Sequence, residues 1–435
     1  MLCFFYHKKI FFHIIFYMEK LLINGGRKLS GSVKVDAAKN SFVAILAASV
    51  LCEGEIWLDE FVDLTDITCM LEILKNLGVK AEIFDKKLHL DVKNAKNSVI
   101  SHEFTYKVRS SIFLLGSLLG RFRKAVIAYP GGCKIGARPI DIHLAGFRAL
   151  GVEIEEKHGY IYCDGEHMHS GVFELAFPSV GATESLMMCA SELSGTTIIK
   201  NAAREPEIVD LQNFLNAMGA KVRGAGTECV KIEGVKKLSG TTFSVMPDRI
   251  VAGTYLLSAA ICGGDVLIEN AIAKHNESLL HFLKQTACKI EVRDDKIRLK
   301  ADGRLSSIKR IDTAPYPDFP TDLQPQMMVL QSVSDADCEL YENVFESRFA
   351  LVPELCKMGA SIKIECGCAK IVGVEKLYGA DVYASDLRAG AGLVLAGLCA
   401  EGYTSVYNLN YIDRGYEKIE EKLSLLNADI KRVNF

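Results

Sequence analysis

One motif returns six times along this chain and constrains its fold more than any other feature. An amphipathic helix that ends in a small residue and runs directly into a strand appears in six stretches, among them MLEILKNLGVKAEI, LQNFLNAMGAKVRG and LVPELCKMGASIKI. The residues at these junctions are spaced by 73, 68, 68, 72 and 68 positions. Such regular spacing indicates repeated structural units. The junction residues are Gly78, Gly151, Gly219, Ala287, Gly359 and Asn427.

Each junction residue stands where a helix ends, and there the chain needs a residue that tolerates the left-handed backbone conformation. Glycine at four junctions and asparagine at a fifth meet this need, and Ala287 is the exception. A second apolar helix followed by a strand precedes most junctions, as in LMMCASELSGTTIIKN. The pattern predicts a unit of strand, helix, strand, helix, strand and strand.

The length of the chain favours two domains. A chain of 435 residues exceeds what one hydrophobic core usually serves. Three units per domain, with helices inward and sheets outward, would divide the chain evenly, although the period alone does not fix that grouping. Candidate crossovers between the domains are residues 37–39 and the turn signal MPDR around Pro247.

The charge balance excludes some classes of partner. The formal net charge is -3, and no block of like charges interrupts a composition that is 49% hydrophobic and 24% charged. Nucleic-acid binding through bulk electrostatics is therefore not expected. This charge balance is compatible with a small anionic substrate that is bound by a local cluster of cations.

The cysteines indicate a reducing compartment and no metal site. The 14 cysteines are scattered and form no C-x-x-C pair, which is typical of a cytoplasmic protein. Cys366 and Cys368 form a C-x-C, but no matching His or Cys pair lies nearby in the sequence.

The first 17 residues, MLCFFYHKKIFFHIIFY, are apolar and aromatic. Their longest uncharged run, from Ile10 to Tyr17, is too short to span a membrane, which takes ~20 residues, and no small-residue cleavage site follows. We interpret residues 1–17 as a loose extension or a translation artefact, with a peripheral membrane anchor as the alternative.

The loop PGGCKIGARPID sets Cys133 among glycines and two cations, Lys134 and Arg138. Exposed backbone N–H groups and positive charge both lower the pKa of a thiol and attract anions. The alternative interpretation is a glycine-rich turn with solvated cations. The loop does not meet the Walker pattern G-x-x-x-x-G-K-[ST].

Three further places carry residues that a packed core does not need. Lys39 and Asn40 stand at the start of an apolar helix. A lysine there adds to the positive charge of the helix terminus, which favours a site for an anionic ligand. The alternative is an ordinary surface lysine. Asp322 stands at a helix start after the proline-rich TAPYPDFPTDLQPQ, where an aspartate also serves stability alone. Arg348 and Arg388 complete the set, and Arg388 again opens a helix.

These places suggest one shared chemistry. Lys39, Arg138 and Arg388 would bind a small, multiply charged anion, with a thiol acid and a carboxylate base beside it. Proton donors and acceptors with separated roles are typical of an addition or elimination reaction.

From Met18 onward the chain resembles the UDP-N-acetylglucosamine 1-carboxyvinyltransferases, also called UDP-N-acetylglucosamine enolpyruvyl transferases. The motifs PGGC-x-IG-x-RP, AREPEIVD, FPTDLQ and IDRGYE occur in the order of that family. The resemblance implies an α/β fold of two inside-out α/β barrels with three βαβαββ units each. Residues 38–246 would form one domain, residues 18–37 with 247–435 the other, and the active site would lie in the cleft between them.

The resemblance also implies the reaction. The enolpyruvyl group of phosphoenolpyruvate would pass to the 3-hydroxyl of UDP-N-acetylglucosamine through a tetrahedral ketal, with release of phosphate, as the first committed step of peptidoglycan synthesis. Cys133 matches the cysteine that protonates the methylene carbon and that fosfomycin alkylates, and Asp322 matches the base that takes the hydroxyl proton. Lys39, Arg138 and Arg388 match the cations around phosphoenolpyruvate, whose charge should count most in the intermediate.

Further residues match substrate-binding positions of that family. Asn40 corresponds to a residue that touches both substrates, and Arg348 is expected to bind substrate as well. The residues expected to line the uridine and diphosphate are Arg109, Arg138, Pro139, Ile140, Asp141, Ile142, Ser179, Val180, Gly181 and Val344.

Two positions depart from the family pattern. Asp36 and Ala37 stand where many members have a glycine before the alanine, lysine and asparagine run. Phe177 replaces a lysine that some members carry two residues before the serine of SVGAT, which puts one diphosphate contact in doubt.

Three other interpretations compete with this one. The sister enzyme 5-enolpyruvylshikimate-3-phosphate synthase shares the fold and the co-substrate, and a non-catalytic sugar-nucleotide sensor would share the binding residues. An RNA-terminal phosphate enzyme would need a catalytic histidine and a nucleotide-cradling loop, and no motif of the sequence indicates either. The favoured interpretation expects a cytoplasmic monomer that uses no metal or organic cofactor, binds no nucleic acid and does not insert stably into a membrane.

Overall fold

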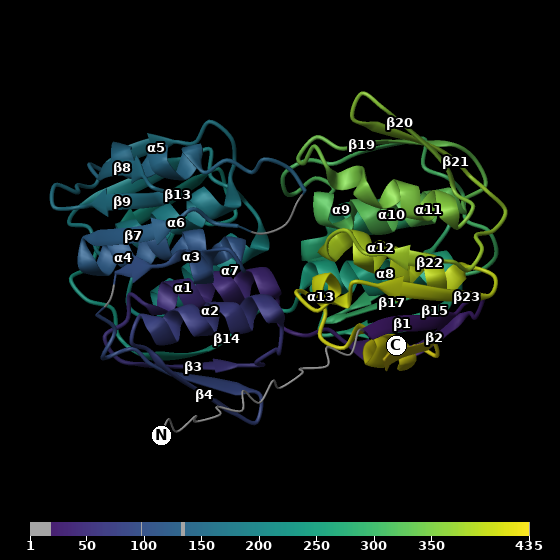
Figure 1. Cartoon of the computed structure of the whole chain (residues 1–435), viewed down its shortest axis with the longest axis horizontal. Helices are drawn as coiled ribbons and strands as arrows, with labels where there is room; N and C mark the ends of the chain where they lie inside the picture. The colour runs from purple at the N-terminus through teal and green to yellow at the C-terminus, as the bar shows by residue number, and fades with distance from the viewer. Residues whose placement is uncertain (1–18, 97, 132–134, 435) are drawn as a thin grey trace, which may run out of the picture.

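The computed structural model describes residues 19–96, 98–131 and 135–434. Figure 1 shows two lobes side by side, each with helices toward its middle and most of its strands around the outside. The predictions for residues 1–17 and for Cys133 fall outside the described residues.

Two separate clusters of buried apolar residues form the cores. One contains residues between Ala37 and Val245, and the other contains Leu21–Val35 together with residues between Ile250 and Ile430. We call the parts around them the first lobe and the second lobe. The limits 38–246 and 18–37 plus 247–435 stay a prediction, and the two cores support it.

The first lobe contains three units. The first unit is β14 (Thr241–Ser244), α1 (Lys39–Ser49), β3 (Glu55–Asp59), α2 (Thr65–Asn76), β4 (Lys80–Phe84) and β5 (Lys87–Asp91). The second is β6 (Val99–Ile100), α3 (His102–Thr105), the 3₁₀ helix η1 (Arg109–Phe113), α4 (Leu114–Phe122), β7 (Lys124–Ala128), α5 (Asp141–Ala149), β8 (Glu153–Lys157) and β9 (Tyr160–Asp164). The third is β10 (Val172–Glu174), α6 (Val180–Ala190), β11 (Thr196–Lys200), α7 (Pro206–Ala217), β12 (Lys221–Arg223) and β13 (Cys229–Glu233).

The second lobe contains three more. The fourth unit is β2 (Leu29–Lys34), α8 (Arg249–Cys262), β15 (Gly264–Glu269), η2 (Ala273–Asn276), α9 (Glu277–Gln285), β16 (Lys289–Arg293) and β17 (Lys296–Ala301). The fifth is β18 (Arg310–Asp312), η3 (Thr321–Leu323), α10 (Gln324–Ser332), β19 (Cys338–Tyr341), η4 (Arg348–Leu351), α11 (Val352–Lys357), β20 (Ser361–Glu365) and β21 (Cys368–Val372). The sixth is β22 (Asp381–Tyr383), α12 (Leu387–Cys399), β23 (Tyr403–Tyr407), α13 (Leu409–Ile412), α14 (Ile419–Ser424), β24 (Asp429–Asn434) and β1 (Glu19–Asn24).

All six sheets have one topology, which confirms the predicted βαβαββ unit. Each has four strands, with one parallel pair followed by two antiparallel pairs, as in the order β6-β7-β9-β8. The strands of the described ranges thus form six separate sheets and not a closed barrel. The inside-out arrangement arises because helices fill the middle of each lobe.

Two strands change places between the lobes. β2 precedes α1 in sequence but pairs with β15 of the second lobe, whereas β14 precedes α8 but pairs with β3 of the first lobe. The two connections run antiparallel where they cross: the Ala38 N–H donates to the Met246 carbonyl at 2.7 Å, and the Asp248 N–H donates to the Asp36 carbonyl at 2.9 Å. The crossovers lie at the predicted places, residues 37–39 and Pro247.

All six junction residues have positive φ angles. The values are 97° for Gly78, 85° for Gly151, 103° for Gly219, 71° for Ala287, 94° for Gly359 and 66° for Asn427. The prediction of a left-handed residue after each helix is confirmed even at Ala287, where an alanine is held in a conformation that favours glycine.

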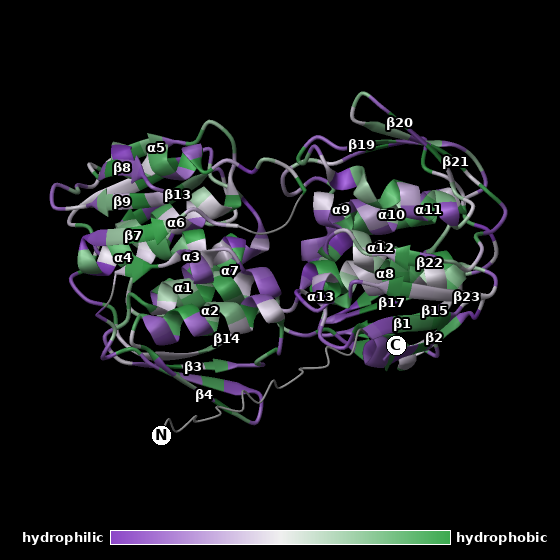
Figure 2. Cartoon of the chain, viewed as in Figure 1, coloured by the Kyte–Doolittle hydropathy of each residue, from purple (hydrophilic) through white to green (hydrophobic). Residues whose placement is uncertain are grey.

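The inner helices are apolar on all sides because other elements surround them. α8, α10 and α12 pack against one another, and α4 packs against α6 and α1. In α12 every residue from Leu387 to Leu398 is buried. Figure 2 shows the hydrophobic colour gathered on helices in the middle of each lobe and the hydrophilic colour along outer loops.

Two features are absent from the described residues. No helix in residues 19–434, apart from the gaps, is long and apolar enough to cross a membrane. Within the same ranges no group of three or more His, Cys, Asp or Glu side chains could hold a metal ion.

Candidate active site

A cavity of about 610 Å³ lies between the two lobes and takes residues from both as its lining. Ile140 is buried and is not part of this lining, and Cys133 lies outside the described residues. The predicted site residues that line the cavity are Lys39, Asn40, Arg109, Arg138, Pro139, Asp141, Ile142, Ser179, Val180, Gly181, Asp322, Val344, Arg348 and Arg388.

The cavity is where the inner helices begin. Lys39, Val180 and Arg249 are the first residues of α1, α6 and α8, and Arg388 is the second residue of α12. Arg109 and Asp322 lie in η1 and η3, which lead directly into α4 and α10. Free N–H groups and the helix dipole make each terminus attractive to anions. The repeat therefore turns six helix starts toward one space.

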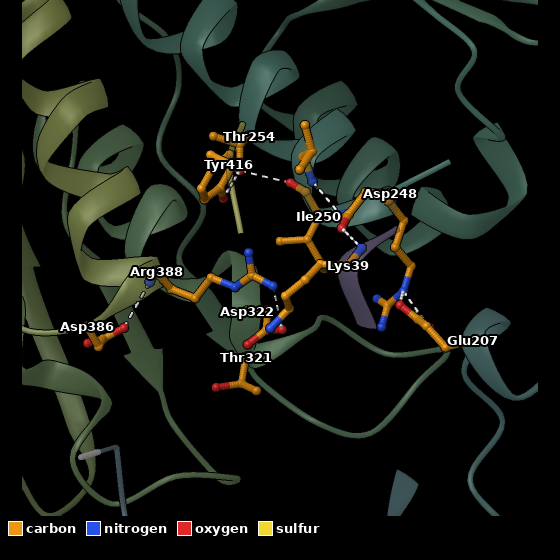
Figure 3. A network of polar contacts seen from close by, with 12 residues as sticks. Lys39, Glu207, Asp248, Ile250, Thr254, Thr321, Asp322, Asp386, Arg388 and Tyr416 are labelled. Atoms are coloured by element: carbon orange, nitrogen blue, oxygen red, sulfur yellow. Dashed lines mark hydrogen bonds and ion pairs between the residues drawn. The ribbon is translucent and has the colours of Figure 1, made fainter. Parts of the chain in front are cut away.

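Asp322 is held by two arginines. Its carboxylate accepts hydrogen bonds from Arg348 at 2.8 Å and from Arg388 at 3.1 Å. Figure 3 shows Asp322 with Arg388. Burial would raise the pKa of Asp322, but the charges of Arg388, Arg348 and Lys39 outweigh it and hold the pKa below its ordinary value. Asp322 is therefore ionised at neutral pH.

Asp386 joins this cluster to α12. Its side chain accepts from the backbone N–H groups of Arg388 at 2.9 Å and Ala389 at 3.1 Å, so it caps the helix, and it lies 3.6 Å from Arg348. The Arg348 side chain is only 1% exposed. A buried arginine between two carboxylates is fixed in place, and it fixes Asp322 in turn.

Lys39 reaches the same space from the first lobe. Its ammonium lies 3.4 Å from Asp66, and Asp66 also accepts from Arg414 at 2.8 Å. Burial lowers the pKa of Lys39, and the neighbouring charge of Asp66 partly restores it. The Lys39 N–H donates to Asp248 at 3.1 Å, and Asp248 caps α8 through Ile250 and Val251 (Figure 3).

The loop after Cys133 touches the second lobe. The Ser347 N–H donates to the Ile135 carbonyl at 3.1 Å, and the Arg138 guanidinium lies 5.4 Å from the centre of the Phe345 ring. Arg109 donates to the carbonyl of Arg138, which has a positive φ of 45°. Burial, with the charge of Arg138, lowers the pKa of Arg109 to about 10. The structure thus brings both predicted arginines to one side of the cavity.

Some cavity residues were missed by the sequence analysis. Glu184, Glu205, Glu207 and Arg249 form a buried cluster in which Arg249 donates to both oxygens of Glu207, at 3.1 and 3.2 Å. Burial, with the charges of Glu207 and Glu205, raises the pKa of Glu184 well above its ordinary value. The motif AREPEIVD contains two of these residues and was the available signal, whereas Glu184 lies within an apolar helix pattern.

Asp66, Arg414 and His143 also line the cavity and were not predicted. Arg414 belongs to the motif IDRGYE, which carried part of the family resemblance. Asp66 lies in the first turn of α2, which follows β3, and His143 lies in the first turn of α5, which follows β7. Their positions in the first helical turn were the only local signal.

Comparisons with known proteins identify the class. Residues 23–423 match the family model described as EPSP synthase (3-phosphoshikimate 1-carboxyvinyltransferase). The crystal structure of the enolpyruvyl transferase NikO from Streptomyces tendae superposes with a TM-score of 0.86 at 22% identity, over 96% of this chain and 100% of that one. EPSP synthase from Acinetobacter baumannii gives a TM-score of 0.75 at 17% identity, over 96% and 100%. The fold is that of the enolpyruvyl transferases, and the protein is a transferase.

Relatives with closer sequences narrow the assignment. The chain is 47% identical to UDP-N-acetylglucosamine 1-carboxyvinyltransferase 2 of Caldanaerobacter subterraneus over 96% of this chain and 100% of the relative. It is 48% identical to UDP-N-acetylglucosamine 1-carboxyvinyltransferase 2 of Carboxydothermus hydrogenoformans over the same shares. The chain belongs to the UDP-N-acetylglucosamine 1-carboxyvinyltransferase family.

Proposed function

We propose that this protein transfers the enolpyruvyl group of phosphoenolpyruvate to the 3-hydroxyl of UDP-N-acetylglucosamine and releases phosphate. The observation that carries the proposal is the ionised Asp322, fixed between Arg348 and Arg388 where inner helices of both lobes begin. The names of relatives that match nearly the whole chain support the acceptor.

The addition step needs a base and an acid. Asp322 takes the proton of the 3-hydroxyl as that oxygen bonds to C2 of phosphoenolpyruvate, and C3 receives a proton, so a tetrahedral ketal forms. We assign the proton on C3 to the thiol of Cys133, by its match to the family cysteine. Elimination then removes phosphate from C2 and a proton from C3, which restores the double bond in the product.

The cations explain how a weakly basic carboxylate can act. Asp322 is a poor base while two guanidinium groups donate to it. A phosphate or carboxylate of the substrate competes for Arg348 and Arg388, so the pKa of Asp322 rises when the substrate is in place. The same cations stabilise the extra charge of the ketal, and they are already oriented by Asp386 and by their helices.

The biological role follows from the reaction. We propose that the protein acts in the cytoplasm in the first committed step of peptidoglycan synthesis, supports cell shape and division, and works as a monomer. Alkylation of Cys133 by fosfomycin, with loss of activity, is expected on the same basis.

The test is phosphate release from phosphoenolpyruvate with two acceptors. We expect release with UDP-N-acetylglucosamine and none with shikimate 3-phosphate, and loss of release in the Cys133→Ala variant. Release with the shikimate ester alone would assign the protein to the sister activity that the family model describes. Tight binding of the sugar nucleotide without release from phosphoenolpyruvate would make the protein a sensor.

A further inference from the structure

Tyr416 is a buried tyrosine to which the proposed reaction gives no role. It belongs to the motif IDRGYE and is only 2% exposed. Its side chain contacts Thr254 of α8, Gln326 of α10 and Arg388 of α12. Three inner helices of the second lobe, which pack against one another, therefore meet around one ring.

The hydrogen bonds around the Tyr416 hydroxyl have one consistent direction. The Thr254 hydroxyl donates to the Ile250 carbonyl at 2.8 Å, so its single proton is used. The 2.8 Å bond between the two hydroxyls must then run from Tyr416 to Thr254 (Figure 3). The Gln326 amide donates to both oxygens, to Thr254 at 3.1 Å and to Tyr416 at 3.3 Å. The phenol is therefore fixed between α8 and α10.

The ring of Tyr416 lies beside the guanidinium of Arg388. The guanidinium carbon is 5.8 Å from the centre of the ring, within the range of a cation–π contact. The Arg388 side chain is only 5% exposed, and such a contact is stronger where water is excluded. Burial raises the pKa of Tyr416, so the ring is a neutral phenol at neutral pH. The ring therefore supports the guanidinium from one side.

The supported guanidinium has donors for two different partners. Nη2 of Arg388 donates to Asp322 at 3.1 Å. Nη1 is buried and has no hydrogen-bond partner among the described residues. An unpaired buried donor is unfavourable, and an anion in the cavity can satisfy it with a charge-assisted hydrogen bond. A guanidinium held in one orientation can thus bind Asp322 and a substrate anion at the same time.

The turn that carries Tyr416 lies against the start of α12. A Cβ on Gly415 would lie 2.7 Å from the Leu387 side chain, so the turn contacts the first residue of that helix. The same turn carries Arg414, which donates to Asp66 of the first lobe at 2.8 Å. The chain here faces the cavity with one side chain and anchors itself in the second lobe with another.

We propose that Tyr416 is a positioning residue that orients Arg388 toward the anionic co-substrate. Tyr416 is not part of the cavity lining, so it acts through Arg388 and not by contact with the substrate. Without the ring, the guanidinium gains other rotamers, and substrate binding has to immobilise it again. The proposal rests on the proposed function for the identity of the co-substrate as phosphoenolpyruvate.

The test measures the affinity for phosphoenolpyruvate by calorimetry, with the full-length protein and no acceptor present. We expect Tyr416→Leu to weaken binding severalfold, up to about tenfold, as the immobilisation of one long side chain does. Tyr416→Phe should bind as the wild type does because the ring remains. Loss of the hydroxyl leaves Thr254 its bonds with Gln326 and Ile250. If Tyr416→Leu does not fold, Tyr416→Met gives the decision, since methionine adapts to the space without supplying a ring.

A double-mutant cycle separates positioning from stability. Tyr416→Leu should have no further effect on affinity in an Arg388→Gln background, because the ring then has no cation to orient. The matched control is Phe214→Leu. Phe214 is fully buried in the first lobe, packs against Phe243 and is not part of the cavity lining. This variant should lower the thermal midpoint, as Tyr416→Leu does, and leave the affinity for phosphoenolpyruvate unchanged.

Unchanged affinity in Tyr416→Leu, or in Tyr416→Met where the former is unfolded, would overturn the proposal, and so would an equal loss in the Arg388→Gln background. Phosphate release with UDP-N-acetylglucosamine separates this result from a failure of the proposed function. A wild type that releases phosphate while Tyr416→Leu keeps full affinity refutes the role of Tyr416 alone. A wild type that binds phosphoenolpyruvate in a manner dependent on Tyr416 and Arg388, but releases no phosphate, refutes the reaction and leaves the role of Tyr416 standing.

Discussion

At the scale of single residues, the site depends on carboxylates whose environments differ. Asp322 is ionised because arginines surround it, whereas Glu184 is only 1% exposed and has two carboxylates as its charged neighbours. Asp322 is in the ionised state that a base requires, although the arginines make it a weak base until substrate anions compete for them, and Glu184 keeps its proton. Opposite environments for similar side chains separate proton-transfer roles within one cavity.

Replacement of Asp322 by asparagine tests its role as the base. We expect kcat for phosphate release to fall by about 100-fold or more, the contribution typical of a positioned base, with a smaller effect on binding of the sugar nucleotide. Steady-state kinetics with a parallel binding titration separates the two. Asp318→Asn, at an exposed position in the same proline-rich loop, is the control. Equal losses in the two variants would remove Asp322 from the mechanism.

Replacement of Glu184 by glutamine tests the burial of a neutral acid. The folded-state pKa of Glu184 is raised, so the wild type retains a proton that the unfolded chain releases above about pH 4.3, and its stability falls as the pH rises. Glutamine does not ionise. We therefore expect Glu184→Gln to raise the thermal midpoint at about pH 8 and to show a smaller gain at about pH 5. Thermal unfolding at the two pH values gives the comparison, and equal gains at both would contradict it.

Local patterns made some site residues predictable. Lys39 and Arg388 stand at helix starts that the sequence marks, and Asp322 follows a run of prolines. Asp66 could not be paired in advance with Arg414, because 348 positions separate them and only the meeting of the lobes brings them together. No local pattern in the sequence marked His143. Its ring nitrogens lack hydrogen-bond partners among the described residues, and this can be seen only once its neighbours in the fold are known.

At the scale of elements, the junction residues show how backbone conformation limits the repeat. Five of the six are glycine or asparagine. Ala287 takes the left-handed conformation although this conformation is energetically unfavourable for alanine. We expect Ala287→Gly to stabilise the protein by on the order of 1 kcal/mol. Gly219→Ala, at a φ of 103° with open space around the added methyl group, should destabilise it by a similar amount. Urea unfolding measures both, and a lower midpoint for Ala287→Gly would contradict the strain.

The order of elements within a unit was predictable and their exchange between lobes was not. Helix and strand periods are local properties of the sequence, so six units could be recognised. β2 and β14 have the alternation of any strand, and which sheet each joins depends on where the chain crosses. The turn signal at Pro247 indicated where the chain crosses between the lobes. It did not indicate which strand β14 or β2 would pair with.

At the scale of the whole molecule, we expect the cavity to attract anions although the chain as a whole is slightly acidic. The net charge is -3, so the attraction comes from helix starts and from cations such as Lys39, Arg138 and Arg388 around one space. Salt screens such attraction, with a Debye length of about 10 Å at 0.1 M. We expect KM for phosphoenolpyruvate to rise severalfold between about 0.05 and about 0.5 M potassium chloride, with little change in kcat.

Sucrose at matched osmolality is the control for that measurement, because it changes the solvent without screening charge. A KM that does not depend on salt would mean that the cations of the cavity are satisfied within the protein.

The two lobes, and the presence of a site between them, could be anticipated from length and from the family resemblance. The contacts that close the cavity, such as Arg249 with Glu207, could not, because each joins residues of different lobes.

The most direct test of the account follows the transferred carbon atoms. Phosphoenolpyruvate labelled with carbon-13 is incubated with UDP-N-acetylglucosamine and the wild-type protein, and the products are followed by nuclear magnetic resonance. The account predicts that the label appears in an enolpyruvyl ether on the 3-oxygen of the sugar as phosphate is released, and that Asp322→Asn nearly abolishes its appearance. Label that stays in phosphoenolpyruvate, or that moves only when shikimate 3-phosphate is offered instead, would contradict it.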